Sequence, residues 1–249
     1  MVTQGDRVGL YLSGMPVPIQ ECNIAVTQPT IKDIVLFGED EFLINVNLLK
    51  NITDIGDSMK KGNSELMLLS DFHVLLVMLK EEPTIKKSIL NFFNLIFPDY
   101  EVEIEDTSIS FSIQEEEETH KVGQITPFNF DNFLNTISDL FEPNINNESE
   151  PEYNPANDAA AEIAAKIKRG REKKRQMTAD KEGPQSLFGR YTSILAIGLQ
   201  MDINIFYNYT PFQLYDSFTR FFSKQSSDLY QKVSTTPLMD VSKMEIPPQ

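Results

Sequence analysis

The 249-residue sequence predicts an α+β fold that is mostly helical, with a small antiparallel β-hairpin or sheet in its N-terminal domain and a C-terminal helical arm. Two patterns carry this prediction. Through most of the chain, apolar residues recur at spacings of three and four, as on one face of a helix. Between Tyr100 and Ile113 they alternate with polar residues, as on strands with one buried face.

The N-terminal elements follow in order along the chain. Residues Val8 to Ile19 resemble a β-hairpin whose proline-containing second arm belongs at a sheet edge or in a loop. Residues 29–38 predict a short helix that ends at Gly38, and residues 39–51 predict a longer helix. Asp54 to Asn63 is polar and predicts a connector.

A second helical pair is predicted over residues 64–80 and 83–97, the latter beginning with a proline that a first helical turn tolerates. After the alternating segment, the acidic run 115–118 ends the hairpin, and Val122 to Ile125 predicts a short third strand. Thr126-Pro127 then begins a helix with one apolar face of Phe130, Phe133, Leu134, Ile137 and Leu140.

The composition changes abruptly after Glu142, where prolines, asparagines and glutamates replace the apolar residues. We therefore expect an acidic α+β domain over residues 1–142 and a Pro/Asn/Glu-rich linker over 143–156. A helical C-terminal region, with a basic helix and a helical hairpin, should cover 157–234. The remaining residues, 235–249, predict an extended tail.

Charge and cysteine content narrow the classes of function. The net charge of −15 argues against attraction of the whole surface to nucleic acid or to an anionic membrane. No apolar run is long enough to cross a bilayer. The single Cys22 cannot form an internal disulfide, which indicates a reducing cytoplasm.

Motifs of catalysis and cofactor binding are missing from the sequence. No glycine-rich phosphate loop, nucleophile elbow or metalloprotease motif occurs, and Cys22, His73 and His120 are poor material for a metal site. We predict His73 to be a satisfied core residue, His120 a surface residue and Cys22 a half-buried filler. The expectation is a non-enzymatic protein with no catalytic, metal or cofactor site.

A basic run stands out in this acidic chain. Between residues 166 and 175, seven basic residues accompany one acidic residue: Lys166, Lys168, Arg169, Arg171, Lys173, Lys174 and Arg175. The run can be a solvated or intramolecularly paired helix face, or it can bind an acidic protein. It can also contact nucleic acid, although no aromatic residue is present for base stacking.

The C-terminal part carries a block of aromatic residues with helical spacing. Our candidate partner-binding residues come from this block: Phe206, Tyr209, Phe212, Tyr215, Phe218 and Phe222. A second apolar stripe precedes it on residues 187–199. Either the two helices pack on each other through these stripes, or part of the apolar surface meets a partner.

Two segments resemble a known family. The first is Pro29-Thr-Ile-Lys-Asp-Ile, followed by Gly38-Glu-Asp and Phe42. The second joins the Lys/Arg-rich helix to the turn Leu199-Gln-Met-Asp-Ile-Asn-Ile-Phe206 and to Thr210-Pro-Phe-Gln-Leu-Tyr-Asp-Ser-Phe-Thr-Arg220. Together, at the two ends of the chain, they cover about a third of it and are similar to the tail assembly chaperone-like proteins of phages that infect Gram-positive bacteria.

The resemblance implies a non-enzymatic protein of the host cytoplasm that acts during virion assembly. Its partners would be the tape measure protein and the tail tube protein, and the negative charge would keep the complex soluble. Self-association stays open, whereas nucleic acid and membrane are not expected as partners. Two alternatives remain: a structural tail or baseplate component of the virion, and a nucleic-acid-binding phage regulator that uses the basic helix.

Overall fold

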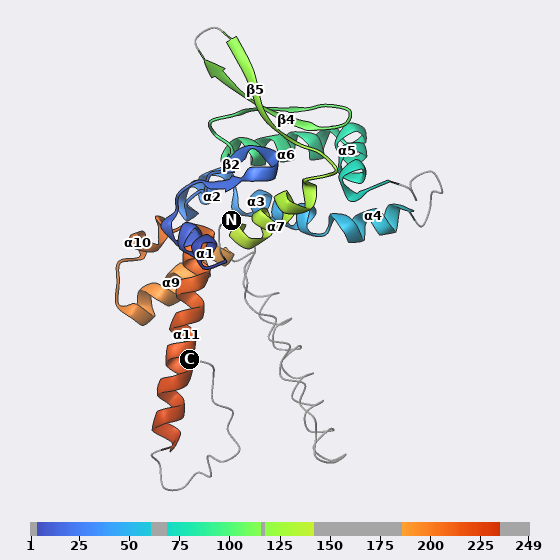
Figure 1. The fold of residues 1–249 in the computed structure, drawn as a ribbon. Helices are drawn as coiled ribbons and strands as arrows, with labels where there is room; N and C mark the ends of the chain where they lie inside the picture. The colour runs from blue at the N-terminus through green and yellow to red at the C-terminus, as the bar shows by residue number, and fades with distance from the viewer. Residues whose placement is uncertain (1–3, 61–68, 116–117, 142–185, 235–249) are drawn as a thin grey trace, which may run out of the picture. The chain divides into compact units, whose positions relative to one another are not determined.

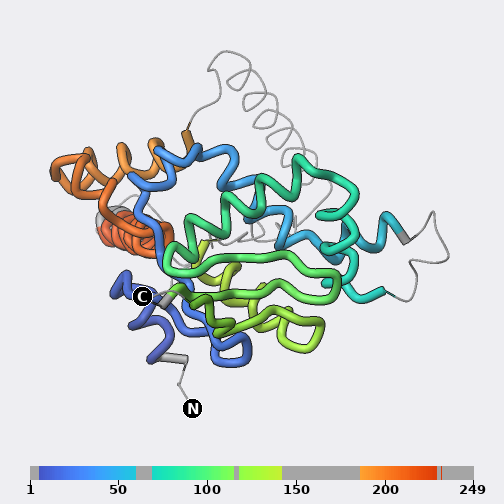
Figure 2. Tube along the Cα trace, turned by 90° about the horizontal axis from the view of Figure 1, so that it is seen from above, coloured from blue at the N-terminus to red at the C-terminus, as the bar shows by residue number. Residues whose placement is uncertain are grey.

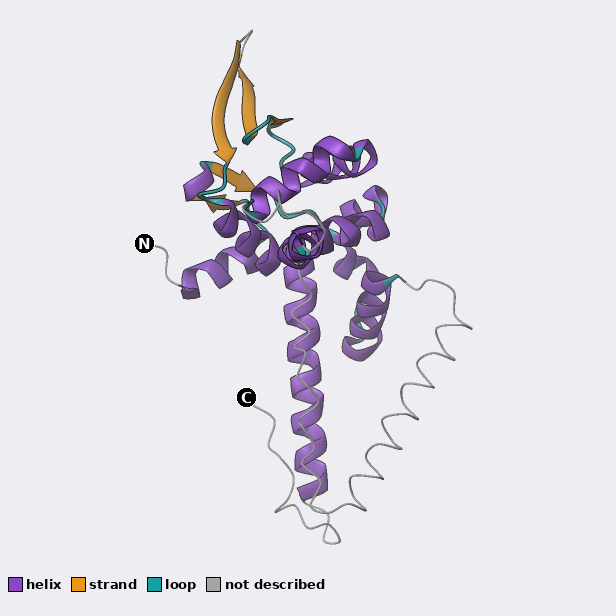
Figure 3. Ribbon diagram, turned by 90° about the vertical axis from the view of Figure 1, so that its right-hand side faces the viewer, coloured by secondary structure: helices purple, strands orange, loops and turns teal. Residues whose placement is uncertain are grey.

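The computed structural model describes residues 4–60, 69–115, 118–141 and 186–234, and its fold is α+β as predicted (Figure 1). Helices dominate the described residues, and their strands form one two-stranded and one three-stranded antiparallel sheet (Figure 3). The chain divides into two compact units. Unit 1 comprises Met1–Pro143 and Asp202–Ser217, and unit 2 comprises Asn144–Met201 and Phe218–Gln249.

This division differs from the predicted one at the C-terminal region. We expected residues 157–234 to form one helical region, but Asp202–Ser217 belongs to unit 1. Backbone hydrogen bonding gives the reason, because the Ile31 amide donates to the Tyr209 carbonyl at 2.8 Å. The Gln213 side-chain amide likewise donates to the Leu12 carbonyl at 2.7 Å. The predicted linker and tail lie outside the described residues.

Unit 1 begins with a helix where the sequence predicted the first arm of a hairpin. Helix α1 spans Gln4–Ser13 and ends before Gly14, which has a φ of 71°. Tyr11 decides this outcome, since its ring is buried and meets the edge of Phe212 at 5.2 Å between centroids. The predicted hairpin is therefore wrong. Strand β1 (Val17–Ile19) pairs instead with β2 (Ile24–Val26) across the short helix η1 (Gln20–Cys22).

The next three helices follow one another with almost no connecting residues. Helix α2 (Ile31–Phe37) begins in a capping box in which Thr30 and Asp33 satisfy each other's backbone amides, and α3 (Glu39–Lys50) follows Gly38. Both helices confirm the prediction. Helix α4 (Ile52–Lys60) contradicts the predicted polar connector. Ile52 is fully buried and Gly56 lies against Val74, so packing on α5 orders this polar segment.

Helices α5 (Asp71–Glu81) and α6 (Pro83–Ile96) confirm the second predicted pair over their described residues. Ser70 caps α5 by accepting the His73 amide hydrogen, and Pro83 occupies the first turn of α6. Figure 2 shows α6 lying beside the strands of the three-stranded sheet, which it contacts through β3.

The three-stranded sheet has the order β3-β4-β5, with bounds Glu101–Ile104, Ile109–Glu115 and Glu118–Ile125. The predicted hairpin and third strand are confirmed, and the third strand starts earlier than expected. The register shifts between Phe111, paired with Gly123, and Ser112, paired with Lys121. Gly123 lies where residues 22–24 pass close to β5, which leaves no room for a side chain.

A cluster of phenylalanines joins the sheet to the helices and forms the core of unit 1. Helix α7 (Phe130–Phe141) supplies Phe133, whose ring lies 6.0 Å from Phe93 of α6. Phe97 meets the edge of the Phe111 ring of β4 at 4.8 Å. All four rings are fully buried, so the predicted apolar faces of α6 and α7 meet each other and the sheet.

The C-terminal segment of unit 1 holds α10 (Ile203–Tyr207) and the first residues of α11 (Pro211–Ser234). Unit 2 contains α9 (Leu187–Leu199) and the remainder of α11. Within unit 2 the Tyr191 ring meets the edge of Phe218 at 4.3 Å, so the two helices pack on each other as one of the two alternatives predicted. No helix of the described part of the chain is long and apolar enough to span a membrane.

Candidate functional site

The single thiol of the chain is held in an unreactive state. Cys22 is buried, and burial, followed by the neighbouring Glu21 carboxylate, raises the pKa of the thiol to about 12. Its Sγ lies 3.9 Å from the Asn129 carbonyl oxygen, which accepts its weak hydrogen bond. A thiol with this pKa carries almost no thiolate near neutral pH, so Cys22 fills space in unit 1.

The two histidines have ordinary structural partners. His73 is half-buried rather than the core residue that we predicted, and its Nδ1 lies 2.7 Å from the Ser70 hydroxyl at the start of α5. His120 is exposed, as expected, and its Nε2 lies 3.7 Å from a Glu118 carboxylate oxygen. Among the described residues, no group of three His, Cys, Asp or Glu side chains could hold a metal ion.

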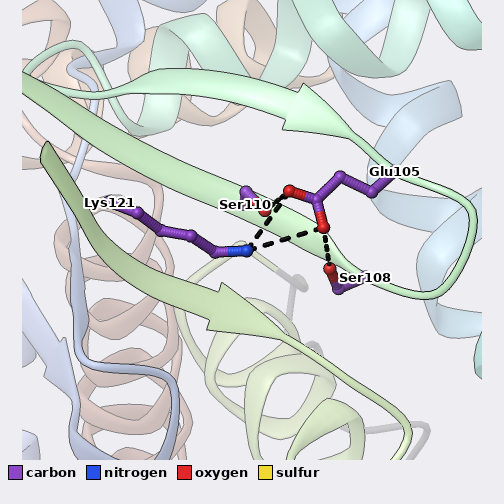
Figure 4. A network of polar contacts seen from close by, with 4 residues as sticks. All are labelled: Glu105, Ser108, Ser110 and Lys121. Carbon is purple, nitrogen blue, oxygen red and sulfur yellow. Dashed lines mark hydrogen bonds and ion pairs between the residues drawn. The ribbon is translucent and has the colours of Figure 1, made fainter. Parts of the chain in front are cut away.

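One carboxylate of unit 1 collects several hydrogen bonds (Figure 4). Glu105, at the end of β3, accepts from Ser108 at 2.6 Å, from Ser110 at 2.5 Å and from the Lys121 ammonium at 3.2 Å. The Ser108 hydroxyl contributes most, followed by Ser110 and Lys121, and together they lower the pKa of Glu105 to about 2. A general acid or base needs a pKa nearer to neutral, so this cluster fastens the β3–β4 turn to β5.

The predicted partner-binding residues have very different degrees of exposure. Phe206 is 1% exposed and Tyr215 is 5% exposed. In this structure neither can meet a partner, and their assignment as partner-binding residues is corrected to core residues. Tyr209 and Phe212 are half-buried in unit 1, where Phe212 packs on Tyr11.

The last two candidates belong to unit 2. Phe218 is half-buried against Tyr191, and its ring lies 4.6 Å from that of Phe222. Phe222 is 43% exposed and is the one member of the predicted set with a substantially open ring. The basic run from Lys166 to Arg175 lies outside the described residues.

Large apolar residues at the C-terminal end of α9 and just after it are exposed, and none of them is among the predicted partner-binding residues. Ile197 is 80% exposed, and Leu199 and Met201 are each more than two-fifths exposed. Ile197 lies on the face of α9 opposite the buried residues Phe188, Tyr191 and Leu195. An isoleucine on the polar side of an amphipathic helix is the sequence signal that would have identified this surface.

Helices α9 and α11 approach each other closely within unit 2, next to these exposed residues. A Cβ atom on Gly198 would lie 2.2 Å from Cζ of Phe221, so the helices are as close here as glycine allows. Phe222 follows directly, with its ring 5.7 Å from that of Phe221. Ile197 and Leu199 lie on different sides of α9, since residues two apart on a helix do not face each other. We call the exposed residues around the end of this helix, Ile197, Leu199, Met201 and Phe222, the α9 apolar surface, and it is our candidate site for binding a protein.

Comparison with protein-family models, with curated proteins and with solved structures finds no match for the chain. The function proposed below therefore rests on the residues of this chain and on the resemblance of its two terminal segments.

Proposed function

We propose that the protein is a non-enzymatic phage tail assembly chaperone that binds the tape measure protein, with tail tube subunits as a further partner, during tail morphogenesis. Its client-binding site is the α9 apolar surface. The observation that carries the proposal is the exposure of Ile197, Leu199, Met201 and Phe222 together in a chain with a net charge of −15. Large apolar side chains exposed around the end of a helix are candidates for protein association.

The chemistry of the site suits a long hydrophobic client. A helix laid on this surface would bury its apolar side chains against those of unit 2, as in other recognition of helices by apolar grooves. The net negative charge of the chain belongs to unit 1 and keeps such complexes dispersed, because like-charged particles repel one another. No covalent chemistry is required, in keeping with the unreactive thiol and the structural role of Glu105.

The N-terminal family motif contributes to the fold. Ile31, Ile34 and Phe42 are fully buried, and Thr30 with Asp33 caps α2. These residues support the proposal as a shared structural pattern, and we assign no client contact to them. The client contacts are instead assigned to Leu199 and Met201 of the second motif, and to Ile197 and Phe222, which lie two residues before the Leu199 turn and two residues after Arg220.

Co-expression with the tape measure protein of the same phage tests the proposal. We expect the wild-type chain to raise the soluble fraction of the tape measure protein and to co-purify with it. Ile197→Glu should weaken the complex about tenfold or more, because burying one isoleucine contributes about 1.5–3 kcal/mol. Leu36→Glu is the matched control, since Leu36 is 78% exposed, like Ile197, but lies on α2 of unit 1.

Two results would overturn the proposal. The first is the absence of any complex at low salt, and the second is a complex that Ile197→Glu and Leu36→Glu affect equally. Mass spectrometry of purified virions separates a chaperone from a structural tail component. An assembly chaperone leaves before maturation, so the chain should be missing from finished particles.

A further inference from the structure

Unit 1 uses one local turn twice, with opposite outcomes for its phenylalanine. The turns are Thr126-Pro127-Phe128-Asn129 before α7 and Thr210-Pro211-Phe212-Gln213 at the start of α11. In each, the threonine amide donates to the side-chain amide oxygen three residues later, at 2.7 Å to Asn129 and 2.9 Å to Gln213. Phe212 is half-buried against Tyr11, whereas Phe128 is 98% exposed.

The exposure of Phe128 does not come from a loose loop. The Asn129 side chain is buried and donates to the Glu21 carbonyl at 2.9 Å and to the Gln124 carbonyl at 3.0 Å. Its backbone amide donates to the Thr126 carbonyl at 3.2 Å, which closes the turn. The turn therefore presents an aromatic ring from a rigid base, which lowers the entropic cost of binding through that ring.

A second feature of unit 1 offers the complementary shape. A groove of about 590 Å³ lies between α5, the start of α6 and the end of β3. Its apolar lining comprises Leu76, Val77, Leu79, Pro83 and Ile104, and its charged rim comprises Lys80, Lys86, Glu105 and Asp106. This volume lies within the range of ordinary ligand pockets and admits an aromatic side chain.

The charges at the rim of the groove favour an acidic partner. Of the four rim groups, Glu105 is held by Lys121 and by two serines. Lys80 and Asp106 lie 3.5 Å apart with both side chains at least 80% exposed, so their pairing is weak. Within the described residues, Lys86 has no carboxylate partner within ion-pair distance. Lys86 therefore leaves one uncompensated positive charge beside the apolar lining of the groove.

The surroundings of Phe128 carry the opposite charge. Asp131 follows it in the first turn of α7, and Glu21 lies beside the turn because its carbonyl accepts from Asn129. Both carboxylate residues are exposed. An aromatic ring with carboxylate residues near it on one surface therefore matches an apolar groove that has an unpaired lysine at its rim on another. Both surfaces belong to unit 1.

From this match we propose that Phe128 of one copy of the protein inserts into the groove of a second copy, with Glu21 and Asp131 facing Lys80 and Lys86. The two surfaces are different, so the contact is heterologous and each copy retains one free surface of each kind. Such a contact can repeat from copy to copy. The inference does not depend on the proposed client or on the α9 apolar surface.

Sedimentation velocity of the full chain at increasing concentration and low salt tests the contact. We expect the weight-average mass to rise above the monomer mass of 28.4 kDa, and to fall back as salt is added. Phe128→Glu should keep the protein monomeric at concentrations where the wild type associates. Ile44→Glu is the matched control, because Ile44 is 64% exposed and lies outside both surfaces.

Mixing two disabled variants distinguishes this contact from a symmetric one. The Phe128→Glu variant retains an intact groove, whereas the Val77→Glu variant retains Phe128. Lys86→Glu, at an exposed residue of the groove, is an alternative to Val77→Glu and also retains Phe128. Each variant alone should be monomeric, and an equimolar mixture should form dimers and nothing larger. Circular dichroism checks that each variant is folded. A wild type that stays monomeric at low salt, a Phe128→Glu variant that associates like wild type, or a mixture without dimers would each overturn the proposal.

Discussion

Replacing Gly123 by alanine should destabilise unit 1, because the backbone of another segment occupies the space of the new methyl group. A Cβ atom at Gly123 would lie 2.5 Å from the Cys22 carbonyl oxygen, 2.6 Å from Cγ2 of Ile24 and 2.7 Å from the Asn23 carbonyl oxygen. Ordinary carbon contacts lie at about 3.5–4.0 Å, so the two segments must separate by about 1 Å.

The magnitude follows from two opposing effects. Overpacking of this kind costs about 1–3 kcal/mol, and the upper end applies because two of the three crowded atoms are backbone oxygens that cannot rotate away. Alanine also restricts the unfolded chain, which returns about 0.4–1 kcal/mol. The net loss is therefore about 2 kcal/mol, which for a unit of this size lowers the Tm by about 4–8 °C.

Urea denaturation followed by circular dichroism measures this loss, and Gly9→Ala provides the matched control. Gly9 lies inside α1, and a Cβ there would have no atom within 4 Å. The same chemical change should therefore stabilise the protein by about 0.5–1 kcal/mol through helix propensity. A Gly123→Ala variant as stable as the wild type would refute the close approach of residues 22–24 to β5. Equal losses in both variants would show that crowding is not the cause.

Three further predictions concern single side chains. The pKa of Glu105 falls from 4.5 to about 2 on folding. The stability that this carboxylate contributes is therefore fully present above pH 4.5 and is lost as the pH falls through about 2. The urea midpoints of Glu105→Gln and wild type should differ at neutral pH and converge toward pH 2. Thr30→Ala should cost about 1 kcal/mol and Thr30→Ser much less, because serine retains the cap of α2; thermal melts compare them. Cys22 should resist Ellman's reagent in the folded protein and react at once in urea, and fast reaction without denaturant would contradict its burial.

The candidate site was predicted only in part. The predicted aromatic residues share a helical spacing, and this spacing occurs in buried stripes as readily as in exposed ones. Phe206 and Tyr215 therefore proved to be core residues, while Phe222 is exposed. Ile197 was not selected because it lies off the stripe, and that position is the reason for its exposure.

Local chemistry determined much of the fold. Three local features were visible in the sequence: the Thr30 cap, Pro83 in a first helical turn, and the alternation through Val102, Phe111 and Ile113. They were visible there because caps, proline and periodicity act over a few residues. The apolar faces of α6 and α7 were likewise visible in the sequence. Each of these features acts within a single element.

Tertiary structure decided the outcomes that depend on a distant neighbour. Residues 4–13 form a helix whose Tyr11 packs on Phe212, far along the chain, and no local pattern contains that contact. The two Thr-Pro-Phe turns show the same limit within one molecule. Their local hydrogen bonds match, yet Phe212 is half-buried against Tyr11 and Phe128 is exposed, because burial depends on which distant segment folds against the turn.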